Sequence, residues 1–120
     1  MLLGHRDAAR WQLQRIWPCC NTWPERAERD RRFAIDPREQ LVAQRWARLR
    51  GWQVLGVAHS HPTSGAEPSP TDLSLCVTPA LMVICSGAGD CRAWWLPEGA
   101  ERQAQPPRLV PWRMGDGSPP

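Results

Sequence analysis

The order of apolar and polar residues predicts seven strands and two helices. Alternating or continuous apolar segments bounded by Gly, Pro and charged residues are typical of strands, and the chain has them at 2–3, 8–17, 32–35, 52–58, 80–85, 91–96 and 108–112. Two other segments carry helix-start signals, at 36–50 and 69–77. Strands interleaved with helices predict an α/β fold in which one mixed β-sheet packs against the helices.

The segment that begins at residue 36 has the strongest helix pattern. Asp36 is a good N-cap, Pro37 suits the first helical position, and Glu39 can reach back to the backbone of the cap. We therefore assign Glu39 to capping rather than to catalysis. Gly51 is the residue that ends the helix. The apolar residues of this segment predict one buried stripe, made of Leu41, Val42, Trp46 and Leu49.

The stretch from residue 59 to residue 72 carries the candidate chemistry. His59 and His61 follow the predicted strand 52–58, and residues two apart on a strand point to the same face. Ser69 has the features of an N-cap, so the first turn of the next helix can bring Asp72 back toward the two imidazoles. Two imidazoles and one carboxylate suit a catalytic zinc ion with a fourth position left for water.

This stretch resembles the signature of the JAMM (MPN-plus) zinc metalloproteases. A bare His-x-His pair is weak, because such pairs are common by chance, whereas the full spaced string is specific. The ordinary alternative is a strand that ends in two polar residues, followed by a capped helix. Every fixed position of the signature is matched here, by His59, Ser60, His61, Pro62, Ser69 and Asp72.

The resemblance implies a role for each matched residue. His59, His61 and Asp72 would be the zinc ligands, and Ser69 would stabilise the oxyanion of the reaction. Capping the helix is the alternative role of Ser69. The resemblance also implies a single MPN domain at 1–113, similar in layout to the cytidine deaminases. We expect a disordered tail at 114–120, because chain ends are commonly disordered.

Relatives use a glutamate as general base, on a helix ahead of their first strand. The start of this chain, Met1 to Gly4, resembles the last part of that strand, and no residue matches the glutamate. We expect that helix to lie before Met1. Either the start codon is misassigned, or the protein has truly lost the helix. Without the base, we expect zinc binding but feeble hydrolysis, because general acid–base help contributes about 10²–10⁴-fold. A missing helix would also expose an apolar sheet face and favour aggregation or a homodimer.

Composition narrows the setting. The 120 residues carry a net charge of +3 and all 15 basic residues are Arg, so the charge is too small to predict nucleic-acid binding. The charged run at 25–32 is interpreted as a solvated loop rather than a phosphate-binding site. A third possibility, between these two, is that the run binds an acidic patch on a partner protein. No apolar run predicts a membrane span. The odd number of cysteines and the absence of a C-x-x-C pair favour reduced thiols and a cytoplasmic location. The five cysteines are Cys19, Cys20, Cys76, Cys85 and Cys91.

Three functions follow from these patterns. The first is a zinc-dependent peptidase or isopeptidase that cuts near the Gly-ended tail of a ubiquitin-like or sulfur-carrier protein, as the JAMM resemblance implies. The second is a non-catalytic zinc-binding MPN scaffold. The third, a nucleoside or base deaminase, is disfavoured because its H-x-E and P-C-x-x-C motifs are absent from the sequence.

Overall fold

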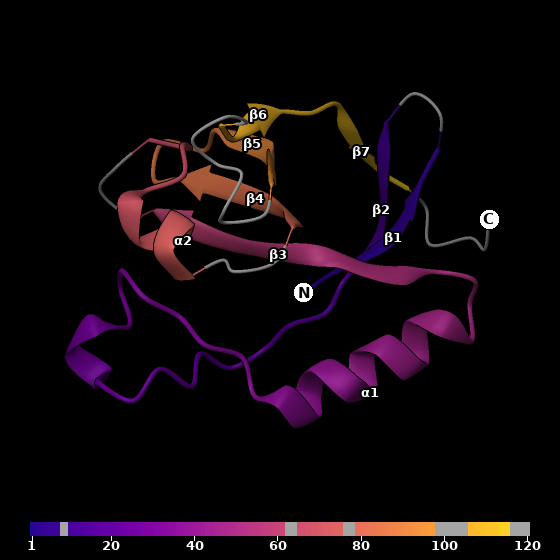
Figure 1. Cartoon of the computed structure of the whole chain (residues 1–120), viewed down its shortest axis with the longest axis horizontal. Coiled ribbons are helices and arrows are strands. Elements are labelled where there is room, and N and C mark those ends of the chain that lie inside the picture. Colours follow the sequence, from indigo (N-terminus) through magenta and orange to yellow (C-terminus); the bar gives the residue numbers. More distant parts are fainter. Residues whose placement is uncertain (8–9, 62–64, 76–78, 98–105, 116–120) are drawn as a thin grey trace.

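The computed structural model describes residues 1–7, 10–61, 65–75, 79–97 and 106–115 (Figure 1). Its α-helices are α1 (Pro37–Arg48) and α2 (Pro70–Leu75), with a 3-10 turn at Arg26–Glu28. Its strands are β1 (Leu2–Arg6), β2 (Trp11–Ile16), β3 (Gln53–His61), β4 (Ala80–Ser86), β5 (Cys91–Leu96), β6 (Arg108–Leu109) and β7 (Trp112–Met114). They form one mixed sheet in the order β6-β5-β4-β3-β1-β2-β7. The predicted α/β fold is confirmed.

The sheet curls until its two edges are joined by one short segment. The edge strands β6 and β7 are consecutive in the chain, and only residues 110 and 111 separate them. The Val110 N–H donates to the Ala93 carbonyl on one side, and the Trp11 N–H donates to the Pro111 carbonyl on the other, each at 3.0 Å. We predicted one edge strand at 108–112; the structure divides this segment between two edges, at a proline that cannot donate to a strand ladder.

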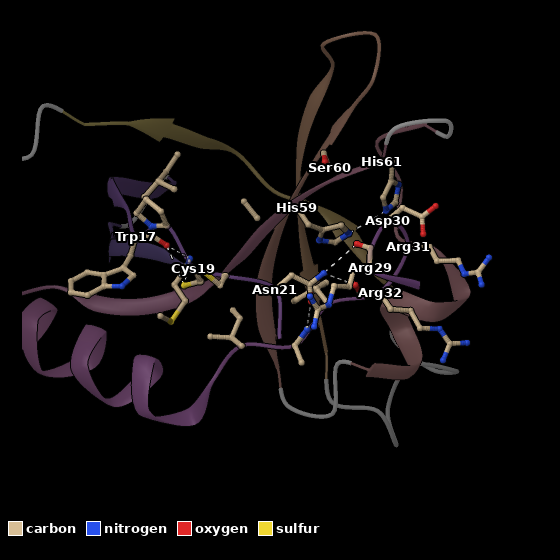
Figure 2. A pocket seen from close by; sticks show the side chains of 18 residues that line it. Trp17, Cys19, Asn21, Arg29, Asp30, Arg31, Arg32, His59, Ser60 and His61 are labelled. Atoms are coloured by element: carbon tan, nitrogen blue, oxygen red, sulfur yellow. Dashed lines mark hydrogen bonds between the residues drawn. The ribbon is translucent and has the colours of Figure 1, made fainter. Parts of the chain in front are cut away.

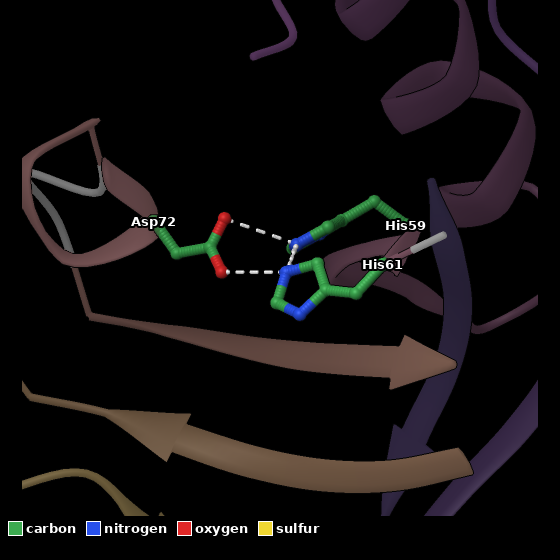
Figure 3. Close-up of side chains that lie close together, drawn as sticks. All are labelled: His59, His61 and Asp72. Carbon is green, nitrogen blue, oxygen red and sulfur yellow. Dashed lines mark hydrogen bonds and ion pairs between the residues drawn. The ribbon is translucent and has the colours of Figure 1, made fainter. Parts of the chain in front are cut away.

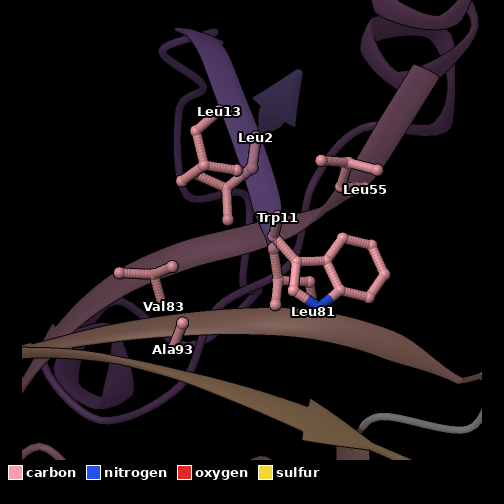
Figure 4. Packing of buried hydrophobic residues seen from close by; sticks show 7 residues of the cluster. All are labelled: Leu2, Trp11, Leu13, Leu55, Leu81, Val83 and Ala93. Carbon is pink, nitrogen blue, oxygen red and sulfur yellow. The ribbon is translucent and has the colours of Figure 1, made fainter. Parts of the chain in front are cut away.

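Curling buries one face of the sheet against itself. Trp11 of β2 stacks on Trp95 of β5 with ring centroids 5.4 Å apart, although three strands lie between them in the sheet. Side chains from five strands enclose this face, so it is not the exposed apolar face that a missing helix was expected to leave. The buried cluster comprises Leu2, Trp11, Leu13, Leu55, Leu81, Val83 and Ala93 (Figure 4).

Helix α1 begins as predicted but buries a different face. Asp36 caps it, since its carboxylate accepts from the Arg38 N–H at 2.9 Å. Ala43 and Ala47 are fully buried against the layer of Leu3 and Trp52. The predicted stripe was wrong for three of its four residues, because Leu41, Val42 and Leu49 are 65%, 55% and 80% exposed. Small side chains allow the close approach of helix and sheet that the larger ones would prevent.

Glu39 does not serve the cap as predicted. Its carboxylate accepts a hydrogen bond from the indole N–H of Trp17 at 2.7 Å. Trp17 in turn packs edge-on against Trp46 of α1, with centroids 5.5 Å apart. Glu39 thus ties the segment after β2 to the helix.

Several element boundaries differ from the predictions. The strand predicted at 8–17 is shorter, and the one predicted at 32–35 is not a strand, although the Ala34 carbonyl accepts from the Thr22 N–H at 2.9 Å. Met114, placed in the predicted tail, ends β7. Residues 116–120 lie outside the described residues. No helix that the structure describes is long and apolar enough to cross a bilayer.

The prediction that all the cysteines are reduced was wrong for two of them. Cys85 and Cys91 face each other in the register of β4 and β5 and form a disulfide, with Cα atoms 4.1 Å apart. The antiparallel pairing of the hairpin brings them together, which spacing motifs do not reveal. Cys19 and Cys20 are free thiols. Cys76 lies outside the described residues.

The pairing of β3 with β4 depends on a glycine. A Cβ atom at Gly56 would overlap the carbonyl oxygen of Leu81 on β4, whereas one at Gly65 would meet no atom within 4 Å. We expect Gly56→Ala to lower the free energy of unfolding by about 3 kcal/mol, the upper range for overpacking, in urea denaturation of metal-free protein. The matched control Gly65→Ala should change it by less than about 0.5 kcal/mol. Equal stability of the two variants would contradict this packing.

Candidate metal centre

The end of β3 positions the two histidines. Strand β3 lies in the interior of the sheet and pairs with β4 along residues 56–61. The Gly87 N–H, in the turn after β4, donates to the His61 carbonyl at 3.0 Å. Because side chains alternate along a strand, His59 and His61 emerge on one face. The neighbouring hairpin thus holds the backbone that carries both imidazoles.

Helix α2 positions the carboxylate through a reciprocal cap. The Asp72 N–H donates to Ser69 Oγ at 3.1 Å, and the Ser69 N–H donates to Asp72 Oδ2 at 2.9 Å. This is the capping-box pattern with Asp in place of Glu. The Asp72 carboxylate is therefore fixed at the helix start, as the sequence predicted. Ser69 occupies the cap position, which was its alternative role.

The three side chains converge on one point (Figure 3). His59 Nε2 lies 3.0 Å from Asp72 Oδ1, and His61 Nε2 lies 3.0 Å from Asp72 Oδ2. The two Nε2 atoms are 3.1 Å apart. Ligands at 2.0–2.1 Å from a tetrahedral zinc ion lie about 3.3 Å from one another. The Nε2–Nε2 distance, and the distance from each Nε2 to its own nearest carboxylate oxygen, are each within a few tenths of an ångström of such an edge.

The hydrogen bond of His61 Nδ1 leaves its Nε2 atom directed at this point. His61 Nδ1 lies 2.8 Å from the carbonyl oxygen of Gly65. A carbonyl only accepts, so Nδ1 carries the proton, and Nε2 of the neutral ring is an acceptor. That Nε2 atom then faces the Asp72 carboxylate and the His59 imidazole. A shared cation could bind to all three groups. A ring N–H held by a carbonyl is also the usual partner of a metal-ligating histidine.

Asp72 is ionised in spite of its burial. Its side chain is 5% exposed. Burial acts to raise the pKa of Asp72, but hydrogen bonds from His59 and from the Ser69 N–H, together with the charge of His59, lower it to about 2. A buried carboxylate that keeps its charge is a strong partner for a cation. The donor set of two imidazoles and one carboxylate fits zinc.

A cavity of about 440 Å³ opens beside the histidines (Figure 2). His59, Ser60 and His61 line one end, and Trp17 and Cys19 line the other. The segment 29–35 forms a further wall, and Phe33 contacts the ring of His59 with centroids 5.1 Å apart. This wall could not be predicted from the sequence, because contacts between a loop and a distant strand leave no periodic pattern in the order of residues.

The geometry can be compared with known proteins. A family model described as prokaryotic homologs of the JAB domain matches residues 1–97. The chain belongs to the Prok-JAB family. Its matched region includes β1 to β5 and all three candidate ligands. The resemblance to small prokaryotic JAMM proteins is thereby confirmed at the level of the family.

Two individual proteins are similar to this Prok-JAB chain. A Thermus thermophilus protein named as a probable TtuB-protein conjugate cleaving protease is 33% identical over 94 residues, which are 78% of this chain. The chain spans 61% of the length of that relative. A solution structure of a Salinibacter ruber protein has a TM-score of 0.59 and 27% identity, and the match covers 99% of this chain and 78% of the other.

The low pKa of Asp72 predicts a pH dependence of folding stability. The folded-state pKa of about 2 lies below the reference value of 3.8. The stabilisation is therefore present above pH 4 and disappears as the pH falls through 2. In metal-free protein, the unfolding free energy of wild type minus that of Asp72→Asn should be about 2 kcal/mol larger at pH 5 than at pH 2. A difference that does not change with pH would contradict the ionised, hydrogen-bonded carboxylate.

Proposed function

We propose that this Prok-JAB domain is a zinc-dependent peptidase or isopeptidase. Its substrate would be a conjugate of a small sulfur-carrier protein of the ubiquitin type, cut at the amide bond that follows the Gly-ended tail. The observation that carries the proposal is the convergence of His59, His61 and Asp72, two of which, His59 and His61, line a cavity. The name of the Thermus relative, a conjugate-cleaving protease, supports the choice of substrate.

We assign a role to each of these residues. His59, His61 and Asp72 would hold the zinc ion, which when bound supplies Lewis acidity and a nucleophilic water. The cavity beside them would receive the extended tail with its scissile carbonyl at the histidine end. Ser69 Oγ accepts from the Asp72 N–H and keeps a hydroxyl proton of its own, which it would donate to the developing oxyanion.

Cleavage of a defined conjugate tests this proposal. The substrate is a ubiquitin-fold carrier ending in Gly-Gly, joined through an amide to a reporter and followed by mass spectrometry. We expect the zinc-loaded chain to cleave only slowly after the second Gly, because no residue in it matches the general-base glutamate, which contributes about 10²–10⁴-fold. A form extended ahead of Met1 by a helix that carries this glutamate should cleave faster. His59→Ala and Asp72→Ala should lose both zinc and cleavage, because each removes a ligand. No turnover by either form would contradict a peptidase and favour a zinc-bound scaffold.

The role of Ser69 needs a matched comparison. At saturating zinc, Ser69→Ala should lower kcat about 10²-fold, the usual loss of one oxyanion donor. Ser86→Ala removes a hydroxyl that accepts from the Asp90 N–H in a hairpin turn, and it should leave kcat unchanged. If Ser69→Ala holds zinc and keeps its kcat, Ser69 is a helix cap alone.

A further inference from the structure

We propose that Arg32 determines specificity by binding a carboxylate on the substrate segment that occupies the cavity. This inference rests on the proposed function and extends it, because it names the chemistry of the substrate next to the cleaved bond. The substrate class is an extended peptide with an acidic residue close to its Gly-Gly end. Three independent features of Arg32 carry the inference, namely its anchoring, its unpaired charge and its place in the cavity.

The backbone of Arg32 is fixed on both sides. Its N–H donates to the Glu28 carbonyl at 2.9 Å, and its carbonyl accepts from Asn21 Nδ2 at 2.8 Å. The next residue, Phe33, contacts the ring of His59. Arg32 is therefore held one residue away from a side chain that touches a proposed zinc ligand. The backbone that carries the Arg32 side chain is thus already ordered, so ligand binding does not have to order it.

The charge of Arg32 has no counter-ion in the part of the chain that the structure describes. None of the four ion pairs there includes Arg32. Its side chain is half-buried, and among those residues its Nε is a buried atom without a hydrogen-bond partner. The guanidinium lies 5.5 Å from the ring centroid of Trp23, whose indole N–H is itself bound to Glu28. A partly desolvated cation without a carboxylate is costly, and an anionic ligand would offset that cost.

The cavity places this cation beside the metal centre. His59, His61 and Arg32 all line it, and Figure 2 shows them around the same space. Arg29 and Arg31 also contribute to the lining, against one carboxylate from Asp30. The wall formed by 29–32 is thus positive on balance. A guanidinium binds a carboxylate through two parallel hydrogen bonds, which gives geometric as well as charge selectivity.

The run of charges at 25–32 therefore has two kinds of arginine. Arg29 and Arg31 are exposed and fit the solvated loop that the sequence predicted, whereas Arg32 is half-buried in the cavity wall. If Arg32 served only to stack on Trp23, its replacement would not change the preference of the cavity for acidic over neutral peptides. This difference in expected behaviour separates a specificity role from a structural role.

A binding cycle with synthetic peptides tests the inference without requiring catalysis. The probes are tail peptides that end in Gly-Gly and carry one Glu at each of the four preceding positions in turn, each paired with its Gln counterpart. Binding to zinc-loaded protein is measured by calorimetry for wild type, Arg32→Gln and Arg32→Lys. At the best position we expect Glu→Gln to weaken wild-type binding about tenfold, as expected for the loss of a charge-assisted pair, and to weaken Arg32→Gln binding less than twofold.

The variants keep the result interpretable. Arg32→Lys retains the charge and should keep part of the preference for Glu. Arg45→Gln, which removes an exposed arginine on α1, is the matched control and should behave as wild type. Unchanged zinc stoichiometry in Arg32→Gln shows that the domain is folded. An equal Glu preference in wild type and Arg32→Gln, or no preference at any position, would overturn the inference.

Failure of this inference is separate from failure of the proposed function. If the Gly-Gly conjugate is cleaved while Arg32→Gln keeps the full preference for Glu, the peptidase proposal stands and the role of Arg32 falls. If the preference for Glu depends on Arg32 while no conjugate is cleaved, Arg32 binds a carboxylate in a non-catalytic binding module, and the peptidase proposal is wrong. The two measurements therefore decide the two claims independently.

Discussion

Asp72 carries a buried charge, and the groups that compensate this charge hold the start of helix α2 against the end of strand β3. A carboxylate that is 5% exposed is unfavourable unless hydrogen bonds and a cation compensate it. Here Ser69 supplies one backbone donor, and His59 and His61 bring two ring nitrogens to about 3 Å. In metal-free protein, hydrogen bonds from His59 and Ser69 and the charge of His59 keep the Asp72 carboxylate ionised, with a pKa of about 2. The same convergence of two imidazoles and a buried carboxylate fits a shared cation.

The curled sheet supplies the rigidity that such a site needs. Donor atoms must be held within about 0.5 Å to select one coordination geometry, and both histidines belong to β3, in the interior of the sheet. Gly56 permits the close approach of β4, and the β4–β5 hairpin, closed by Cys85 and Cys91, holds the end of the strand. One wall of the cavity comes instead from the segment 29–35, which is not part of the sheet, and Phe33 of that segment contacts the ring of His59.

The local parts of this account could be predicted from the sequence, and the long-range parts could not. Spacing and cap chemistry placed His61 on a strand end and Asp72 on a helix start, because both depend on neighbouring residues. The face that α1 buries could not be predicted. Ala47 is buried and Leu49 is exposed because the sheet lies close to the helix, and that distance is not encoded in the local pattern. The contact of Phe33 with the site joins segments far apart in the chain, and no periodicity records such a contact.

X-ray absorption at the zinc K-edge of the loaded protein tests the central claim most directly. The account predicts one zinc ion per chain with four nitrogen or oxygen ligands at about 2.0–2.1 Å. It also predicts the multiple-scattering signal of two imidazoles, from His59 and His61. A sulfur shell at about 2.3 Å would place the ion on Cys19 or Cys20 instead. That result, or a protein that retains no zinc, would contradict the account.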